Sequence, residues 1–549
     1  MAMQKRALGA ALLLPFGLLA QGADLVVTHA RIYTGNPAQP RASVLAAKNG
    51  RLVYVGDGAA PWIGPATRQI DAHGAALLPG LIDSHVHLAA LGDSLETLDL
   101  RGMQSEAAIA AKVRQAAAGH KPGEWIQGRS WDQNLFPGKQ FPSAAALDQA
   151  APANPVFLTR VDGHAAWVNQ RALDLADVNA ATPDPPGGKV IRDAAGRPTG
   201  VLVDRAQGLV RAKIPAATLA EVERRMERGA RECARLGLTT VHDAGVGALE
   251  LQADRALIAR HALPVRVYAM LSVSEDNSGL WREYQRKGPE LGDFLTVRSV
   301  KLYADGALGS RGAALLAPYS DEPANSGLLI SSQKLIARIA AEAVRAGFQV
   351  NTHAIGDRAN HVVLDTYAAA LGGPNDHRFR IEHAQVVAPA DFARFRQYSV
   401  LASMQPTHAT SDMPWAEARL GPQRIRGAYA WRNFLNLGVA LPLGSDFPVE
   451  SPNPLLGFYA AVVRQDHHGN PPGGWYPEQR LTREEALRGF TLAGAYAAFQ
   501  EKDKGSLEPG KLADFVLLSD DIMQVPPGAI WQAHVTLTVL GGAVVYSAP

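Results

Sequence analysis

The middle of the sequence predicts an α/β fold built on a closed (β/α)8 barrel of the TIM type. Eight β-like runs alternate there with helical runs, and strands separated by helices pair in parallel. The eight runs are 77–84, 239–242, 265–273, 294–303, 348–353, 379–383, 400–404 and 439–445. An open, doubly wound sheet is the alternative, but no glycine-rich nucleotide-binding turn follows any run.

Both ends of the chain are rich in short β-like runs that Gly and Asn residues punctuate, as hairpins require. These runs are 24–34, 43–48, 51–55, 513–518, 533–540 and 543–547. We expect them to pair into one small composite β-sandwich domain, residues 24–77 plus 505–549. Two independent fringes are the alternative. The barrel would then comprise residues 78–99 plus 211–504.

The connection after the first barrel strand is much longer than a barrel requires, running from about residue 88 to residue 218. We expect residues 100–210 to form an inserted α/β subdomain that lies over the barrel mouth. This insert carries Trp131 and the run 162–169, which includes His164. Either side chain could contact a substrate from above the barrel, and either could instead be structural.

Residues 1–23 have the pattern of a secretory signal peptide. Lys5 and Arg6 precede an apolar run over 7–20, and small residues follow it. The apolar run contains Pro15 and is shorter than the ~20 residues that a membrane span needs. The sequence therefore predicts an exported protein, periplasmic or secreted after cleavage, with no membrane span in the mature chain.

The composition excludes several classes of protein. Lys+Arg total 54 and Asp+Glu total 52, so no excess positive charge favours nucleic acid. A hydrophobic content of 47% is typical of a globular protein. Cys233 is the single cysteine, which rules out an internal disulfide. A small-molecule substrate is the expected partner, and a homodimer is left open.

Candidate metal ligands stand at the ends of the predicted barrel strands. His85 and His87 are spaced i, i+2, so they share one face of the first strand and could bind one ion. Catalytic groups of such barrels lie at the carboxyl ends of the strands. One or two divalent ions, with Zn²⁺ first and Mn²⁺ or Fe²⁺ as alternatives, fit such ligands. The candidates are His85, His87, Lys301, His353, His383 and Asp446.

Several motifs resemble the metal-dependent amidohydrolase superfamily, in particular the branch that contains N-substituted formamide deformylase and related exported hydrolases. They are 79–87, 162–169, 301–309, 351–357, 381–384, 444–446, 481–487 and 505–515. The resemblance covers essentially the mature chain. It implies a barrel with a composite β domain, and it implies that all six strand-end candidates belong to the metal site.

Lys301 needs a separate explanation because the alternation of residues 297, 299 and 301 places it inside the barrel. A buried ammonium group without a partner is costly. The resemblance implies that CO₂ carbamylates Lys301, which gives an anionic ligand able to bridge two ions. The alternative is a salt bridge from Lys301 to Asp305 or Asp446 in a site with one metal.

These parts predict hydrolysis by a metal-activated water. Asp446 would take the proton of that water and later pass one to the leaving nitrogen. His383 or His164 would stabilise the oxyanion. Trp131 and Tyr303 could line the substrate pocket, although ordinary packing explains each equally well.

The leading hypothesis is therefore a hydrolase of non-peptide C–N amide bonds, acting on an N-acyl, N-formyl or cyclic amide. An ester or lactone hydrolase is the first alternative, because the same water attacks any activated carbonyl. A non-catalytic exported protein that binds a metal or ligand is the second. Retention of Asp446 argues against that last reading, since a binder needs no base.

Overall fold

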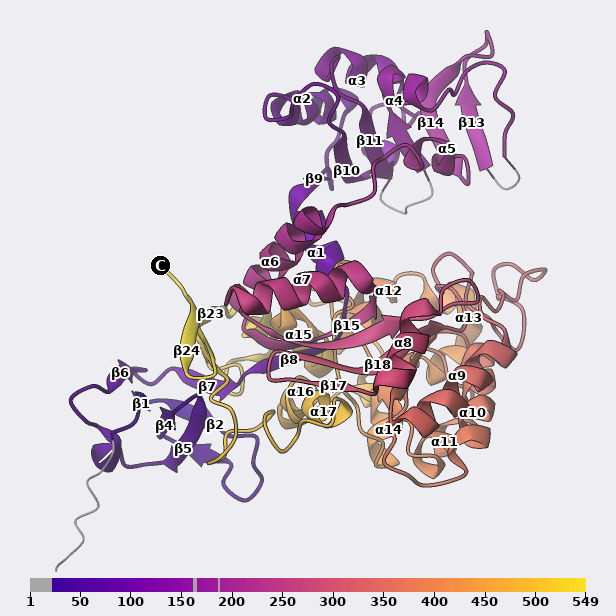
Figure 1. The fold of residues 1–549 in the computed structure, drawn as a ribbon. Coiled ribbons are helices and arrows are strands. Elements are labelled where there is room, and N and C mark those ends of the chain that lie inside the picture. Colours follow the sequence, from indigo (N-terminus) through magenta and orange to yellow (C-terminus); the bar gives the residue numbers. More distant parts are fainter. Residues whose placement is uncertain (1–21, 161–164, 186–187) are drawn as a thin grey trace, which may run out of the picture.

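The computed structural model describes residues 22–160, 165–185 and 188–549 and contains the barrel that the sequence predicts (Figure 1). Seven of its strands pair in parallel within one sheet, and their order around the sheet is the same as their order along the chain. These strands are β8 (Leu81–Val86), β15 (Leu238–Val246), β16 (Arg266–Ser272), β18 (Leu295–Tyr303), β19 (Gln349–Ala354), β20 (Arg380–His383) and β21 (Leu401–Ser403).

The eighth run closes the barrel without forming a regular strand. Met404 donates its backbone N–H to the Pro442 carbonyl at 3.1 Å, and Ser84 donates to the Leu443 carbonyl at 3.0 Å. The segment 441–446, called the closing segment below, therefore lies between β21 and β8. Pro442 has no N–H to donate, which explains why the ladder stays irregular here.

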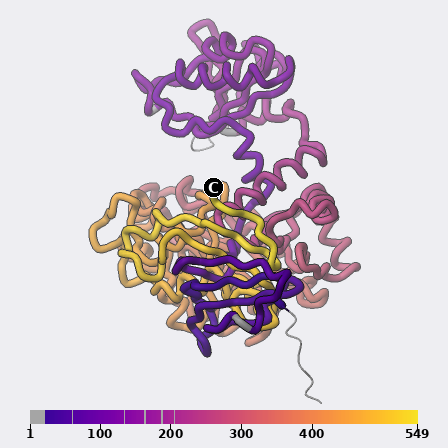
Figure 2. The backbone as a smooth tube through the Cα atoms, turned by 90° about the vertical axis from the view of Figure 1, so that its left-hand side faces the viewer, coloured from indigo at the N-terminus to yellow at the C-terminus, as the bar shows by residue number. Residues whose placement is uncertain are grey.

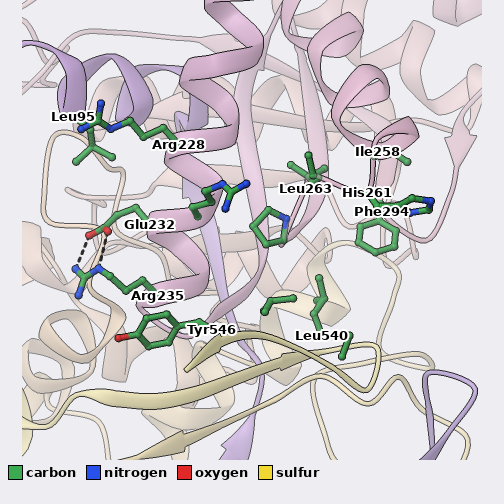
Figure 3. Close-up of a pocket in the computed structure, with 15 residues that line it drawn as sticks. Leu95, Arg228, Glu232, Arg235, Ile258, His261, Leu263, Phe294, Leu540 and Tyr546 are labelled. Carbon is green, nitrogen blue, oxygen red and sulfur yellow. Dashed lines mark hydrogen bonds and ion pairs between the residues drawn. The ribbon is translucent and has the colours of Figure 1, made fainter. Parts of the chain in front are cut away.

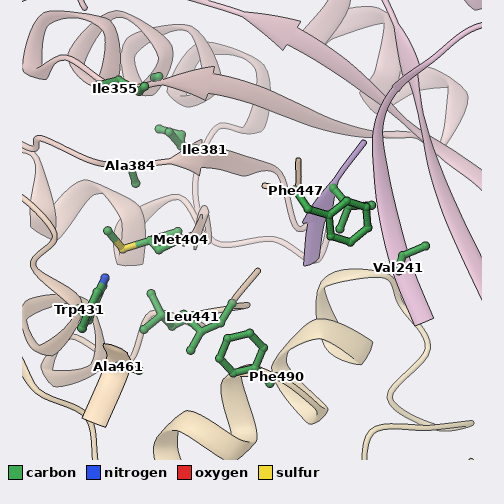
Figure 4. Close-up of a cluster of buried hydrophobic side chains, with 14 of the residues drawn as sticks. Val241, Ile355, Ile381, Ala384, Met404, Trp431, Leu441, Phe447, Ala461 and Phe490 are labelled. Atoms are coloured by element: carbon green, nitrogen blue, oxygen red, sulfur yellow. The ribbon is translucent and has the colours of Figure 1, made fainter. Parts of the chain in front are cut away.

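Helices surround the barrel and cover its hydrophobic core. The helices of the barrel are α1 (Leu88–Glu96), α6 (Leu219–Arg235), α7 (Ala248–Ala259), α8 (Gly279–Lys287), α9 (Gln333–Ala346), α10 (Asp357–Leu371), α11 (Phe392–Gln397), α12 (Pro406–Asp412), α13 (Ala416–Arg424), α14 (Trp431–Asn436), α15 (Pro454–Val463), α16 (Arg483–Gly489) and α17 (Leu492–Ala497). Figure 4 shows part of this core, where Met404 and Phe490 are buried together with Leu441 of the closing segment. The core thus supports the segment that an irregular ladder holds only weakly.

The two ends of the chain meet in one six-stranded sheet. Its order is β24 (Ala543–Ser547), β23 (Val535–Leu540), β22 (Phe515–Leu518), β7 (Ala76–Pro79), β2 (Arg31–Tyr33) and β3 (Arg41–Ala42). A four-stranded sheet of β5 (Arg51–Gly56), β4 (Val44–Lys48), β1 (Leu25–Thr28) and β6 (Arg68–Asp71) accompanies it. Val27 and Leu45 from the smaller sheet share a hydrophobic cluster with Phe515 and Val539 from the larger one.

The run 77–84 is one strand in the sequence reading, but the structure divides it in two. β7 belongs to the sheet of the chain ends, whereas β8 belongs to the barrel. Gly80 lies between them, and a Cβ there would stand 2.2 Å from the Thr239 hydroxyl. This close approach lets the chain pass directly from one sheet into the other.

The insert forms a six-stranded sheet of its own. Its strands, in sheet order, are β13 (Gly188–Arg192), β14 (Pro198–Asp204), β12 (Ala165–Val168), β11 (Val156–Arg160), β10 (Ile126–Trp131) and β9 (Leu98–Asp99). Its helices are α2 (Glu106–Ala117), α3 (Ala144–Ala150), α4 (Gln170–Leu175) and α5 (Gln207–Arg211). Figures 1 and 2 show the insert set apart from the barrel and joined to it through α1 and α6, and its expected position over the mouth stays a prediction.

Helices α1 and α6 pack closely enough to act as a stalk for the insert. A Cβ on Gly92 would lie 1.8 Å from the Arg225 carbonyl oxygen, and a Cβ on Gly229 would lie 2.8 Å from the Leu88 carbonyl oxygen. Arg224 and Glu96 add an ion pair at 2.8 Å. In the described part of the chain, no helix is long and apolar enough to cross a membrane.

The stalk contact gives a testable prediction. We expect Gly92→Ala to lower the free energy of unfolding by about 1–3 kcal/mol, because the added methyl group overpacks the α1–α6 interface. Urea unfolding followed by circular dichroism measures this. Gly208→Ala in α5, where nothing lies within 4 Å of the added Cβ, is the control and should raise stability by up to about 1 kcal/mol. Equal stability of the two variants would contradict the close packing.

Candidate active site

Histidines from several strand ends surround the carboxylate of Asp446. His87 Nε2 lies 3.2 Å from Asp446 Oδ1, and His85 Nε2 lies 3.5 Å from the same oxygen. His408 Nε2 lies 3.8 Å from Oδ2. Two groups, His85–His87–Asp446 and His383–His408–Asp446, each bring their ligand atoms within 4.8 Å of one another. Asp446 belongs to both groups, so it stands at the centre of the site.

The closing segment places Asp446 beside the end of β8. Asp446 adopts a left-handed φ of 61° and donates its N–H to the His85 carbonyl at 2.8 Å. One residue earlier, Ser445 donates its hydroxyl to Asp83 Oδ2 at 2.6 Å and its N–H to Asp83 Oδ1 at 3.0 Å. A Cβ on Gly444 would stand 2.6 Å from Asp83 Oδ1. Only glycine therefore permits this approach of the two segments.

Buried acceptors fix the ring orientation of two histidines. His85 donates Nδ1–H to Glu382 Oε2 at 2.6 Å, and His383 donates Nδ1–H to Gln405 Oε1 at 2.7 Å. Each bond leaves Nε2 as the nitrogen with a free lone pair. Such outer partners orient metal-binding histidines and increase their basicity.

The site has the features that a bound cation would satisfy. Asp446 Oδ1, His353 Nε2 and His408 Nε2 are buried and have no hydrogen-bond partner among the residues that the structure describes. Buried polar atoms without partners are costly, and a carboxylate is the costliest. Imidazole nitrogen and carboxylate oxygen are the ligands that Zn²⁺ and its neighbours accept. The residues present therefore fit a divalent metal ion.

The electrostatics of the site keep His85, His353 and His383 neutral and Asp446 charged. Burial, together with the positive charge of Lys301, lowers the pKa of His85 well below its usual value and that of His353 to about 3. Burial by itself would raise the pKa of Asp446, but the imidazoles close to its carboxylate, His87 first, hold that pKa well below its usual range. Neutral imidazoles and an ionised carboxylate are the forms that bind metal.

Lys301 is buried at the end of β18 and faces the same cluster. Its Nζ lies 3.1 Å from His85 Nε2 and 4.5 Å from the centre of the Tyr303 ring. Within the residues that the structure describes, it forms no ion pair with Asp305 or Asp446. Asp305 instead accepts three backbone N–H groups, from Ala314, Ile355 and Gly356, at 2.8–2.9 Å. The salt bridge considered as an alternative is therefore not formed.

The three substrate-binding candidates have different outcomes. Tyr303 lies beside the site, with its ring centre 5.5 Å from that of His353. Trp131 is fully buried in the insert core, where its Nε1–H donates to the Leu158 carbonyl at 2.8 Å. Its expected contact with a substrate is thus corrected, because packing uses its whole surface. His164 lies outside the described residues.

The sequence reading missed three side chains that complete the site. Glu382 lies in the motif 381–384 but has no predicted role, and no strand-end pattern singles out Gln405 or His408. Gln405 and His408 come shortly after β21, and His408 lies on α12. The neighbouring strand β20 supplies His383, and the neighbouring closing segment supplies Asp446. Extending the search a few residues beyond each strand end would have found them.

A second hollow lies on the outside of the barrel and is separate from this site. Figure 3 shows the groove, of about 790 Å³, with the ion pair between Glu232 and Arg235 at its edge. Pro264 and Phe294 line it. Pro264 lies just before the start of β16, and Phe294 directly precedes β18. It therefore opens at the amino-terminal side of those strands, away from the catalytic end of the barrel.

Comparison with known proteins decides the family. The profile of the amidohydrolase family matches residues 68–546. The chain belongs to the amidohydrolase family. The resemblance to this superfamily, the barrel fold and the expectation of an enzyme are thereby confirmed, and the protein is a metal-dependent hydrolase.

Three similar proteins span nearly the whole chain. Protein LONG AFTER FAR-RED 3 of Arabidopsis thaliana is 36% identical over 97% of this chain and 92% of its own. N-substituted formamide deformylase of Arthrobacter pascens is 26% identical over 96% of this chain and 99% of its own. The crystal structure of an uncharacterized metal-dependent hydrolase from Pyrococcus furiosus is 30% identical, with a TM-score of 0.77 over 91% of this chain and 100% of that one.

The hydrogen bond between His85 and Glu382 predicts a measurable effect on metal binding. Glu382→Gln keeps the size of the side chain but weakens this bond, so we expect metal affinity to fall about 10–100-fold. Competition with a chromogenic chelator measures the affinity. Glu322→Gln, the same change in an exposed loop, is the control and should leave it unchanged. Wild-type affinity in Glu382→Gln would show that Glu382 does not support a ligand.

Proposed function

We propose that this protein hydrolyses a non-peptide C–N amide bond in a small molecule, namely an N-acyl, N-formyl or cyclic amide. The observation that carries the proposal is the ionised, buried carboxylate of Asp446, whose Oδ1 has no hydrogen-bond partner among the described residues although His85 and His87 lie within 3.5 Å of it. A pure binding site would not need such a base. The name of the formamide deformylase also supports a C–N bond as the target.

One or two divalent metal ions, with zinc the best fit, would be held by His85, His87, His383, His408 and Asp446. The two overlapping groups support a count of up to two. When bound, the ion polarises the scissile carbonyl and lowers the pKa of a bound water toward ~7. His353, with its unpartnered Nε2, stands as a further candidate ligand.

The residues of the chain would share the remaining work. Asp446 accepts the proton of the attacking water at Oδ1 and then passes it to the leaving nitrogen, which departs as a neutral amine. The Nδ1–H bond to Gln405 holds the His383 ring in place, so its Nε2 can bind the ion or stabilise the oxyanion without rotation. Tyr303 would form one wall of the substrate pocket.

We further propose that Lys301 is carbamylated in the active protein. The neutral Nζ forms a bond to the carbon of CO₂ and releases one proton, and the carbamate carries one negative charge. This change replaces a cation beside His85 with an anionic oxygen ligand. The location of Lys301, buried 3.1 Å from His85 and without an ion pair in the described residues, favours this reading.

Carbamylation predicts the response of Lys301→Ala. We expect the variant to lose at least one equivalent of metal and most of its activity, because a bridging ligand is missing. Short carboxylates such as acetate should partly restore both, since they can occupy the vacated space. Metal analysis and turnover with and without acetate measure this. Full metal content and a full rate in Lys301→Ala would refute the bridge.

Two alternatives remain distinguishable by experiment. An ester or lactone hydrolase would use the same site, and a non-catalytic binding protein would hold the metal without turnover. Location outside the cytoplasm, periplasmic or secreted, is likewise a proposal that rests on residues 1–23 of the sequence. Residues 1–21 lie outside the described part of the structure.

Asp446→Asn tests the proposed reaction. Zinc-loaded wild-type protein should hydrolyse compounds in a panel of N-acyl, N-formyl and cyclic amides faster than matched esters. We expect Asp446→Asn to lower turnover by roughly 10²–10⁴-fold, because the proton acceptor is lost. Asp466→Asn, the same substitution in a surface loop, is the control. Near-normal turnover in Asp446→Asn would refute the base, and turnover of esters alone would refute the C–N specificity.

A further inference from the structure

Two exposed apolar side chains lie at the carboxyl end of β18, next to the candidate active site. Ile330 donates its N–H to the Ala304 carbonyl at 2.8 Å, and Leu329 forms an antiparallel bridge with Asp305. Leu329 packs against the barrel core. Because alternate residues of an extended segment face opposite sides, Leu328 and Ile330 face away from that core. Their exposed fractions are 61% and 57%.

The position of this pair is fixed by the structure beneath it. Ala304 directly follows Tyr303, which lies beside the site. Asp305, the next residue, is buried and accepts three backbone N–H groups from the loops around it. Leu328 also donates its N–H to the Gly312 carbonyl at 3.4 Å. The two apolar side chains therefore stand on a hydrogen-bonded platform at the rim of the barrel mouth.

A third exposed apolar side chain stands on the other side of the mouth. Val449 is 65% exposed and donates its N–H to the Asp446 carbonyl at 2.9 Å. The closing segment that carries Asp446 lies between β21 and β8, and β18 is the fourth strand from it in either direction around the barrel. Val449 and the Leu328–Ile330 pair thus stand on opposite sides of the barrel mouth, with the metal cluster between their strands.

We propose that Leu328, Ile330 and Val449 bind a large apolar substituent of the substrate, next to the scissile bond. Single exposed apolar residues are ordinary on a protein surface. Here they flank a polar, ion-binding centre from opposite sides, which is the arrangement of pockets that bind an amphipathic ligand. This inference rests on the proposed function, because it uses the same site. The substrate class is an amide with a polar reacting group and a long or bulky apolar group.

A pair of hydroxamic acids tests the inference without depending on turnover. Acetohydroxamic acid and octanohydroxamic acid share one metal-binding head group and differ only in the length of the alkyl chain. Titration calorimetry with the zinc-loaded protein gives both dissociation constants. We expect the octanoyl compound to bind at least tenfold more tightly than the acetyl compound, because its chain buries apolar surface against the rim.

Variants assign this preference to the rim. Leu328→Ser and Val449→Ser should each reduce the octanoyl preference by roughly five- to tenfold and leave acetohydroxamate affinity unchanged. Leu291→Ser is the matched control, because Leu291 is 69% exposed but pairs near the amino end of β18, at the opposite end of the barrel. It should change neither constant.

Each outcome separates the rim from the reaction. Equal binding of the two hydroxamates, or an equal loss of preference in Leu291→Ser, would overturn the rim assignment. If the octanoyl preference depends on Leu328 and Val449 while only esters are hydrolysed, the C–N proposal fails and the rim assignment stands. If short amides are hydrolysed but chain length has no effect on binding, the C–N proposal stands and the rim assignment fails.

Discussion

The burial of the Asp446 carboxylate among histidines is the constraint on which the rest of the site depends. A charged carboxylate that is removed from water needs compensating donors or cations. Histidines approach it from three directions: His85 and His87 at the end of β8, His383 at the end of β20, and His408 just after β21. Because His85 and His383 carry the lone pair on Nε2, a bound cation is the compensation that this arrangement fits. Glu382 and Gln405 hold two of these rings from behind. The barrel therefore acts as a frame that brings distant histidines to one carboxylate.

That frame depends on an irregular element. The closing segment pairs with β21 and β8 through a few backbone hydrogen bonds, and Asp83 anchors it through both the hydroxyl and the N–H of Ser445. Burial raises the pKa of Asp83 to about 7, so the ionised form of this carboxylate costs free energy in the folded protein. The same contact that closes the barrel sets the position of the Asp446 carboxylate. One short stretch of chain thus both completes the barrel and positions Asp446.

Much of the architecture could be predicted from the sequence, and the failures have physical causes. The alternation of strand-like and helical runs predicts the barrel, even though strands such as β19 and β20 carry several polar and charged residues. The sequence leaves Trp131 equally open to a pocket and to ordinary packing, and the structure buries it in the insert's own core. His408 was missed because it lies on a helix rather than at a strand end. The position of the insert depends on the α1–α6 packing, which no local pattern reveals.

The sequence by itself determined the metal-binding chemistry of this protein: histidines, a lysine and an aspartate at the ends of apolar strands. These signals are local, since residue type and strand period are read directly from the chain. Only the tertiary structure decided which of them meet. It placed Asp446 between two histidine groups, left Lys301 beside His85 without an acidic partner in the described residues, and set apolar side chains across the mouth. Such distances depend on barrel closure, which joins segments that lie hundreds of residues apart.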